Sequence, residues 1–258
     1  MNSFDLYNHT SAACSELITK NYSTSFSLGI RMFDKEFQNP IYGIYGFVRF
    51  ADEIVDTFHD FDKKELLADF RKDTFKAIYQ GISLNPVLQS FQLVVNKFQI
   101  DHQLITDFLD SMEMDLYKTT YESEALYNKY IYGSAEVVGL MCLQIFTKGD
   151  KKFFEELAPY ARSLGAAFQK INFLRDMNSD MEERGRVYFP GIDLTKFDEH
   201  TKQAILSDIQ IDFDKSLEGI RLLPKGARRG VYLAYVYYLN LYKNIRNASI
   251  EKILAERI

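Results

Sequence analysis

The sequence predicts an all-α protein, a helical bundle, and three observations lead to that class. Its 258 residues include only 13 Gly and 5 Pro, too few turn-forming residues for a β-sandwich or barrel with many hairpins. Nearly every segment repeats its apolar residues with the 3.6-residue period of an amphipathic helix. No linker, low-complexity tract or internal repeat interrupts the chain, so we expect residues 1–258 to form a single domain.

Three helices in the first half have clear start or stop signals. Residues 62–80 place their apolar side chains on one broad face, and Gly81 ends the segment. Asn85 precedes Pro86, and proline is favoured at the first position of a helix. Asp101 is the expected N-cap of the third helix.

The second half is predicted to contain further helices, one of them interrupted by proline. We expect the long stretch 151–183 to be kinked or broken near Pro159, because proline removes a backbone donor. Pro190 and Gly191 mark an irregular break after it. The other helices predicted here are 123–147, with Ser123 as its N-cap, 212–223 and 225–246.

Composition and charge exclude several classes of function. The net charge of −5 argues against a nucleic-acid binder. Cys14 and Cys142 offer neither a disulfide framework nor metal-ligand spacing, so we expect a reducing, cytoplasmic location. The N-terminus lacks the pattern of a signal peptide, and the longest mainly apolar stretch, 137–146, is far shorter than the ~20 residues that span a bilayer.

The first candidate site is an acidic pair on a predicted helix. Asp52 and Asp56 are four residues apart, so both carboxylates project from one helix face, with Arg49 one turn before them. Their neighbours in the sequence are almost all apolar, which is unusual for acidic residues that face solvent. This setting favours a functional pair.

The second candidate site is a polar stripe that steps by three, four and four residues. It runs through Gln169, Asn172, Asp176 and Asp180, and Arg175 lies beside it. Amide and carboxylate oxygens together form a mixed ligand set suited to hard cations.

Two interpretations of these stripes stay open. Acidic residues four apart on a helix most often form a solvated face. Carboxylates brought close in a partly dry site instead repel each other unless a proton or a cation bridges them. Oxygen ligands without His or Cys suit Mg²⁺, which shares its ligands with phosphates, so facing stripes would form a Mg²⁺-diphosphate site with the two arginines on phosphate oxygens. The 21 Phe and 17 Tyr residues fill a core or line an oily cavity.

Several motifs, in this order along the chain, resemble the squalene/phytoene synthase family. They are Ser23-Thr-Ser25-Phe26, Tyr45-x3-Arg49-x2-Asp52-x3-Asp56, a central run from Tyr130 to Leu140, Gln169-x2-Asn172-x-Leu174-Arg175-Asp176-x3-Asp180 followed by Gly185-Arg186-Val-Tyr188-Phe-Pro190, and Tyr238-x3-Tyr242. The resemblance covers essentially the whole chain.

The resemblance implies an all-α, single-domain helical bundle of the class I isoprenoid synthase type with a central apolar cavity. It implies Mg²⁺-dependent 1′–1 condensation of two allylic isoprenyl diphosphates through a cyclopropylcarbinyl diphosphate. We expect two geranylgeranyl diphosphates to give phytoene in carotenoid biosynthesis, since squalene needs a reductant and no dinucleotide-binding G-x-G-x-x-G is present. The alternatives are condensation of farnesyl diphosphate to presqualene diphosphate, dehydrosqualene or squalene, and a non-catalytic scaffold of the same fold.

The resemblance also implies roles for individual residues. The expected metal ligands are Asp52, Asp56, Asn172, Asp176 and Asp180. The expected catalytic residues are Asp52, Asp56, Asp176, Asp180, Tyr45 and Arg49. The expected substrate-binding residues are Ser23, Ser25, Phe26, Tyr130, Gln169, Arg175, Tyr238 and Arg257. Among these, Phe26, Tyr45 and Tyr130 are expected to form aromatic walls that stabilise carbocations.

The implied cofactor is Mg²⁺, with Mn²⁺ as an alternative and no NADPH for phytoene formation. The implied partners are isoprenyl diphosphates, and release of a lipid product suggests peripheral association with the inner face of the membrane. One departure from the family concerns the central run, where Glu136 replaces a small residue that permits a kink beside the tunnel. The shape of the tunnel at that point therefore depends on whether the Glu136 side chain points into it or away from it.

Overall fold

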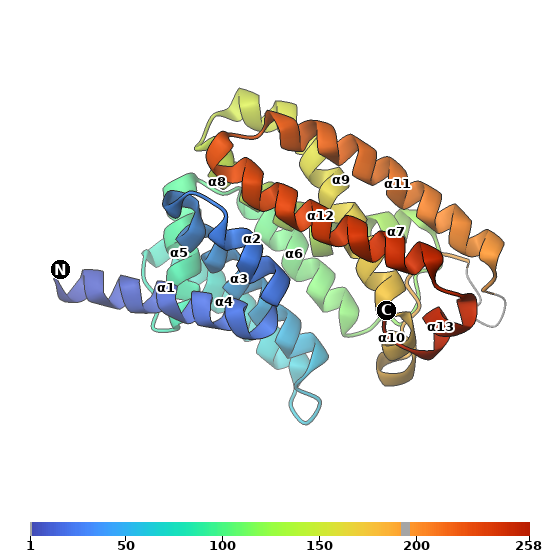
Figure 1. The fold of residues 1–258 in the computed structure, drawn as a ribbon. Helices are drawn as coiled ribbons and strands as arrows, with labels where there is room; N and C mark the ends of the chain where they lie inside the picture. The colour runs from blue at the N-terminus through green and yellow to red at the C-terminus, as the bar shows by residue number, and fades with distance from the viewer. Residues whose placement is uncertain (1, 192–196) are drawn as a thin grey trace.

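The computed structural model describes residues 2–191 and 197–258. Over this part of the chain the backbone is almost entirely helical and forms no strand, and Thr120 and Val187 make an isolated β-bridge. The all-α prediction is therefore confirmed (Figure 1).

The helices fall into two groups along the chain. The first group is α1 (Ser3–Tyr22), α2 (Thr24–Arg31), α3 (Lys35–Asp56), α4 (Lys63–Gln80), α5 (Pro86–Phe98) and α6 (His102–Asp115). The second group is α7 (Glu124–Ile131), the π-helical turn η1 (Tyr132–Glu136), α8 (Val137–Thr147), α9 (Lys151–Arg175), α10 (Met177–Arg184), α11 (Glu199–Leu222), α12 (Lys225–Asn247) and α13 (Ile250–Ala255).

The predicted helix signals are confirmed by hydrogen bonds. Asp62, Asn85 and Asp101 each accept a backbone N–H of the following turn at 2.9–3.0 Å. Ser123 caps α7 in the same way. Gly81 ends α4 with φ of 69°, a left-handed conformation that favours glycine.

Of the two outcomes predicted near Pro159, a kink or a break, the break is wrong. Helix α9 runs through Pro159 and ends at Arg175, and Asp176 separates it from α10, which begins at Met177. Glu155, whose carbonyl loses its partner, and Pro159 both lie on the exposed face, where water can take that bond. The helix predicted over 212–223 also begins earlier, at Glu199, because Asp198 caps it through the backbone N–H of Thr201.

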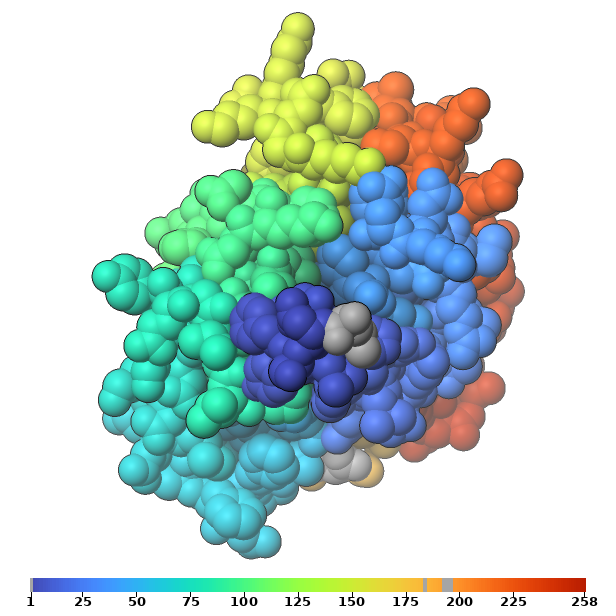
Figure 2. Space-filling view, turned by 90° about the vertical axis from the view of Figure 1, so that its left-hand side faces the viewer, coloured from blue at the N-terminus to red at the C-terminus, as the bar shows by residue number. Residues whose placement is uncertain are grey.

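The two groups of helices build two halves of the molecule. In Figure 1, α11 and α12 lie side by side over α9, while α1 to α6 occupy the opposite half. Figure 2 shows the N-terminal turns of α1 between the blue α2–α3 segment and the teal α4–α5 segment. Buried apolar side chains form one cluster around α3 to α6 and α8, and another around α7, α9, α11 and α12.

The stretch Glu124–Thr147 is long and apolar enough to cross a membrane, judged by its length and composition. Over half of its apolar window, 56%, is buried inside the protein. A core helix passes the same test, so this stretch is only a weak indication of a membrane span.

The π-helical turn η1 is tightly packed between α6 and α9. A Cβ atom added at Gly133 would lie 2.7 Å from the carbonyl oxygen of Asp107 on α6. One added at Gly165 of α9 would lie 2.8 Å from the carbonyl oxygen of Ala135. Helix α9 can approach this turn so closely because Gly165 has no side chain.

We expect Gly165→Ala to lower the free energy of unfolding by about 1–3 kcal/mol, because the atoms it meets belong to the backbone and cannot rotate away. Gly29→Ala is the matched control, since its Cβ would lie 3.4 Å from the nearest atom, an ordinary contact. Urea unfolding of both variants measures the difference. Equal losses in the two variants would contradict the tight approach.

Candidate active site

A cavity of about 1030 Å³ is lined by members of both apolar clusters, including Phe33, Phe146, Phe173 and Ile220. The structure brings every predicted site residue to its wall. These residues are Ser23, Ser25, Phe26, Tyr45, Arg49, Asp52, Asp56, Tyr130, Gln169, Asn172, Arg175, Asp176, Asp180, Tyr238 and Arg257.

The first acidic pair lies in the last turns of α3. Arg49 Nη1 donates to Asp52 Oδ2 at 2.6 Å, and Arg49 Nη2 donates to Glu53. The Asp52 side chain keeps 35% of its surface exposed, whereas Glu53 keeps 12%. The guanidinium therefore has one partner in the cavity wall and one that is more deeply buried.

Asp176 lies at the junction of α9 and α10, between two arginines. Arg175 donates to its two carboxylate oxygens at 2.9 and 2.5 Å, and Arg257 Nε lies 2.8 Å from Oδ1. Asp180, one turn later, is buried and lines the same cavity. The break between the two helices, together with Arg257 from the C-terminal segment, therefore brings two carboxylates and two guanidinium groups to one wall.

The amide groups of the polar stripe are held by an aromatic residue from α12. The Tyr238 hydroxyl donates to Asn172 Oδ1 at 3.2 Å, and Asn172 Nδ2 lies 3.5 Å from Gln169 Oε1. The Tyr238 ring stacks on Phe168 with centroids 3.9 Å apart. Burial raises the pKa of Tyr238, so its hydroxyl remains a donor at neutral pH.

Aromatic rings and hydroxyl groups from α2 and α3 complete this part of the wall. The Phe26 ring centroid lies 5.7 Å from that of Tyr45 and 6.4 Å from that of Tyr238. Ser23 caps α2 by accepting the backbone N–H of Phe26, and its Oγ lies 3.4 Å from that of Ser25. These contacts gather three aromatic rings and two hydroxyl groups around the N-terminus of α2.

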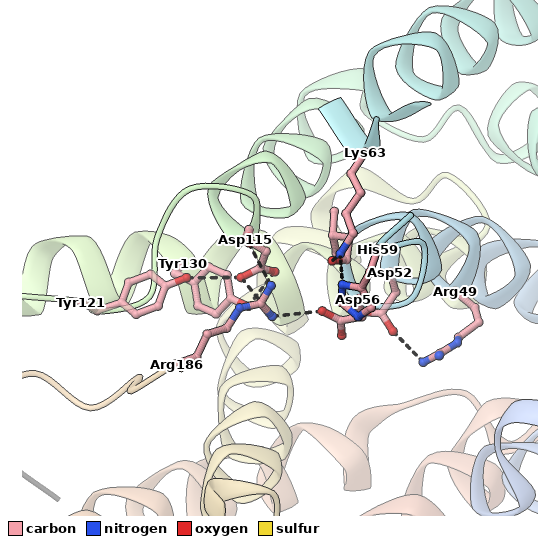
Figure 3. A network of polar contacts seen from close by, with 10 residues as sticks. Arg49, Asp52, Asp56, His59, Lys63, Asp115, Tyr121, Tyr130 and Arg186 are labelled. Carbon is pink, nitrogen blue, oxygen red and sulfur yellow. Dashed lines mark hydrogen bonds and ion pairs between the residues drawn. The ribbon is translucent and has the colours of Figure 1, made fainter. Parts of the chain in front are cut away.

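A buried ionic network behind the first acidic pair was not predicted from the sequence (Figure 3). Arg186 Nη1 donates to Asp56 Oδ1 at 3.0 Å, and Arg186 Nη2 donates to the carbonyl oxygen of Asp115 at 2.9 Å. Gly185, with φ of 62°, reverses the chain after α10 and returns Arg186 to α3 and α6. The network links the first acidic stripe to the segment that follows the second.

The Asp115 carboxylate also holds Tyr130. The Tyr130 hydroxyl donates to Asp115 Oδ2 at 2.9 Å, and its ring packs among Tyr121, Phe173 and Tyr188. The sequence assigned Tyr130 only an aromatic face. In the structure its hydroxyl is fixed as well, so the ring position depends on a carboxyl group that the sequence analysis missed.

A signal for Asp115 does exist in the sequence. It is the last residue of α6, where a negative charge is unfavourable beside the helix dipole, and it follows the apolar Met112 and Met114. An acid in that position needs a cation from elsewhere in the fold. Sequence spacing could not identify Arg186 as that cation, because 71 residues separate the two.

The ionisation of Asp115 predicts how stability changes with pH. Burial raises its pKa to about 7, although Arg186 and the Tyr130 hydroxyl act in the opposite direction. The native state therefore binds a proton that the unfolded chain releases near pH 4, and stability falls as pH rises from about 4 to 7. This group contributes a slope of up to about 1.4 kcal/mol per pH unit.

We expect Asp115→Asn to flatten this part of the stability curve when unfolding is measured without divalent metal from pH 5 to 8. The charged groups that face Asp115 are Arg186, Asp56 and Asp52, with the hydroxyls of Tyr121, Tyr130 and Tyr188. Asp69→Asn, an exposed change on α4, is the control. An unchanged slope in Asp115→Asn would show that other groups carry the pH dependence.

The donor set fits a divalent metal that is shared with substrate. Among the described residues, no three of His, Cys, Asp and Glu lie close enough together to hold an ion by themselves. Mg²⁺ is usually bound by one or two carboxylates together with water and substrate phosphates, so paired aspartates suffice. Arg49 Nε is buried and, within the described residues, lacks a hydrogen-bond partner, which suits a phosphate oxygen.

Glu136 turns away from the cavity. Arg162 of α9 donates to Glu136 Oε2 at 2.5 Å, and Glu136 is absent from the described cavity wall, whereas Ala135 and Val138 line it. Burial raises the pKa of Glu136, and the ion pair opposes that shift. The acidic residue therefore leaves the tunnel open.

Comparison with known proteins identifies relatives of the whole chain. The 4,4′-diapophytoene synthase of Staphylococcus haemolyticus is 26% identical over 90% of this chain and 86% of that enzyme. The 15-cis-phytoene synthase of Synechocystis is 29% identical over 88% of this chain and 73% of that enzyme.

Two solved structures share the fold. A squalene synthase from Alicyclobacillus acidocaldarius has a TM-score of 0.82 at 20% identity, covering 93% of this chain and 95% of the other. A dehydrosqualene synthase in complex with ligand has a TM-score of 0.82 at 23% identity, covering 95% of this chain and 90% of the other. The helical bundle is therefore an isoprenoid synthase fold.

This fold and these relatives define a prenyltransferase-type enzyme. Residues 19–257 match the squalene/phytoene synthase family, and the chain belongs to that family. Its members act on isoprenyl diphosphates with a divalent metal, in isoprenoid and carotenoid biosynthesis.

Proposed function

We propose that the protein condenses two geranylgeranyl diphosphates head to head, through a cyclopropylcarbinyl diphosphate, to phytoene in carotenoid biosynthesis. The observation that carries this proposal is the cavity of about 1030 Å³, whose wall combines both aspartate pairs with a large apolar surface. The 15-cis-phytoene synthase among the relatives supports the choice of substrate.

In this proposal Asp52 and Asp56, with Asn172, Asp176 and Asp180, hold Mg²⁺ or Mn²⁺. The metal would neutralise the departing diphosphate. Arg49, Arg175 and Arg257 lie beside the acids and would bind phosphate oxygens directly, assisted by the Ser23 and Ser25 hydroxyls.

The remaining residues would bind and shield the reacting carbons. The rings of Phe26, Tyr45 and Tyr130 present aromatic surface, which stabilises a nearby cation by about 2 kcal/mol when water is excluded. Tyr238 and Gln169 would keep Asn172 oriented through the hydrogen bonds described above. The proton lost on ring formation can pass to the departing diphosphate, so no side-chain base is required.

Farnesyl diphosphate is the second candidate substrate, giving presqualene diphosphate, dehydrosqualene or squalene. The diapophytoene synthase of Staphylococcus haemolyticus matches this chain over nearly its whole length, and this observation favours the alternative. We propose a single domain at residues 1–258 that works in the cytoplasm or at the inner face of the membrane, without NADPH if phytoene is the product.

Product mass tests the proposal. The protein is incubated with Mg²⁺ and either geranylgeranyl or farnesyl diphosphate, with and without NADPH. A forty-carbon hydrocarbon from the first substrate alone is the expected result. A thirty-carbon product would move the substrate to farnesyl diphosphate, and dependence on NADPH would then separate squalene from dehydrosqualene.

A thermal-shift experiment tests the scaffold alternative. A non-hydrolysable prenyl thiodiphosphate should raise the melting temperature in Mg²⁺ and raise it much less in EDTA, because the metal links the anion to the aspartates. No shift in either buffer would favour a non-catalytic scaffold.

A further inference from the structure

A second, smaller cavity lies against the first. It has a volume of about 300 Å³, at the lower end of the range of small-molecule sites, roughly 300–1,000 Å³. Asp56, Asp115 and Arg186 line both cavities. The rest of its wall comes from the end of α3, the connection to α4 and the segment after α6, namely Val55, His59, Lys63, Leu116, Tyr117, Lys118 and Thr119.

The wall of this smaller cavity carries more positive than negative charge. Lys63, Lys118 and Arg186 face it, together with the imidazole of His59. Its two acids, Asp56 and Asp115, lie 3.0 and 3.9 Å from the Arg186 guanidinium. Lys118 has no ion-pair partner within the described residues, so its charge is available to an anion.

The Arg186 side chain lines both cavities. Figure 3 shows its guanidinium between Asp115 on one side and Asp56 on the other, with Lys63 and His59 beyond Asp56. Lys63 Nζ is anchored by the carbonyl oxygen of Val55 at 2.8 Å and by His59 Nδ1 at 2.9 Å. Basic side chains thus lie behind the same carboxylate that faces the larger cavity.

In the proposed reaction, one diphosphate has to leave the active site before the second ionisation. The first step breaks a carbon–oxygen bond, and the electron pair leaves with inorganic diphosphate. The second diphosphate stays on the cyclopropylcarbinyl product. The first diphosphate must therefore leave the aspartate pair while this intermediate stays bound.

We propose that the smaller cavity binds the inorganic diphosphate released beside Asp52 and Asp56 and delivers it to solvent past Arg186. This inference rests on the proposed function. Arg186, Lys63 and Lys118 line this cavity and together provide cationic partners for a polyanion. The charged wall disfavours an apolar prenyl chain, so the site is expected to take the free anion.

Binding of inorganic diphosphate to the full chain in EDTA, measured by calorimetry, tests the site. The aspartate pairs need metal to bind an anion, whereas the basic cavity does not. Wild type should bind diphosphate without metal, and Lys118→Glu should weaken that binding at least tenfold. Lys152→Glu, the same charge change at an exposed position that lines neither cavity, should change it less than twofold.

Three results of this experiment would overturn the inference. The first is that wild type does not bind diphosphate in EDTA. The second is that Lys118→Glu and Lys152→Glu weaken diphosphate binding equally. The third is that a prenyl thiodiphosphate displaces the bound diphosphate in EDTA. The last result would assign the cavity to the diphosphate group of a substrate.

Product inhibition tests the role in release. Added inorganic diphosphate should inhibit Lys118→Glu at least fivefold less than wild type, with Lys152→Glu unchanged. Equal inhibition of all three would overturn the release route even where the anion site exists. If no prenyl diphosphate is turned over at all, the proposed function fails, and binding in EDTA still decides whether the smaller cavity is an anion site.

Discussion

Asp52→Asn should lower turnover of isoprenyl diphosphates at least about a thousandfold, equivalent to about 4 kcal/mol of lost transition-state stabilisation. The change removes one charged ligand from the site proposed to hold the metal. The fold should persist, because Asp52 is partly exposed and Arg49 retains its second partner, Glu53. Single-turnover rates with Mg²⁺ and far-UV circular dichroism measure the two effects.

Asp110→Asn is the matched control for this prediction. Asp110 also pairs with an arginine, Arg71, at 2.6 Å, but it lies outside the cavity wall. Its loss should leave turnover within about twofold of wild type. Unfolding of Asp52→Asn, or equal loss of turnover in both variants, would instead assign the α3 acids a structural role.

Arg186→Gln should lower the free energy of unfolding by about 3–5 kcal/mol. Only 8% of the Arg186 side chain is exposed, and its removal leaves two carboxylates close together without their cation. Burial lowers the pKa of Arg186 and the nearby acids raise it, with a net increase, so the guanidinium remains charged at every working pH. Urea unfolding at pH 8 in EDTA measures the loss.

A double variant separates lost charge pairing from lost packing. Asp115→Asn removes one of the two carboxylates that lose their cation in Arg186→Gln. In that background it should therefore restore at least about 1 kcal/mol of the free energy of unfolding. In the wild-type background Asp115 keeps Arg186 as its cation, so the same change should stabilise the protein less at pH 8. Additive effects of the two changes would contradict a direct interaction.

Much of the fold and the site could be predicted because it depends on local patterns. The period of apolar residues and the caps at Asp62, Asn85 and Asp101 depend on interactions within a few residues, and the structure confirms them. The four-residue spacing of Asp52 and Asp56 also fixes their shared face. These features can be predicted without knowing how distant segments of the chain pack.

Other features depend on contacts between distant segments. The interruption at Asp176 changes the backbone at a single residue, and periodicity averaged over several turns cannot detect it. Pro159 was expected to interrupt α9, but exposure of the affected carbonyl group makes it tolerable. The Arg186 network joins α3, α6 and the segment after α10, so its members become neighbours only in the complete fold.

The turn η1 sets the phase of α8 relative to α7. Tyr132–Glu136 adds backbone to what is otherwise one continuous helix, and each residue of an α-helix turns the chain by about 100°. A single deletion in this segment would rotate the whole of α8 by that angle and present a different set of its side chains to the substrate. A change in chain length at η1 would therefore alter the cavity lining without replacing any side chain of α8.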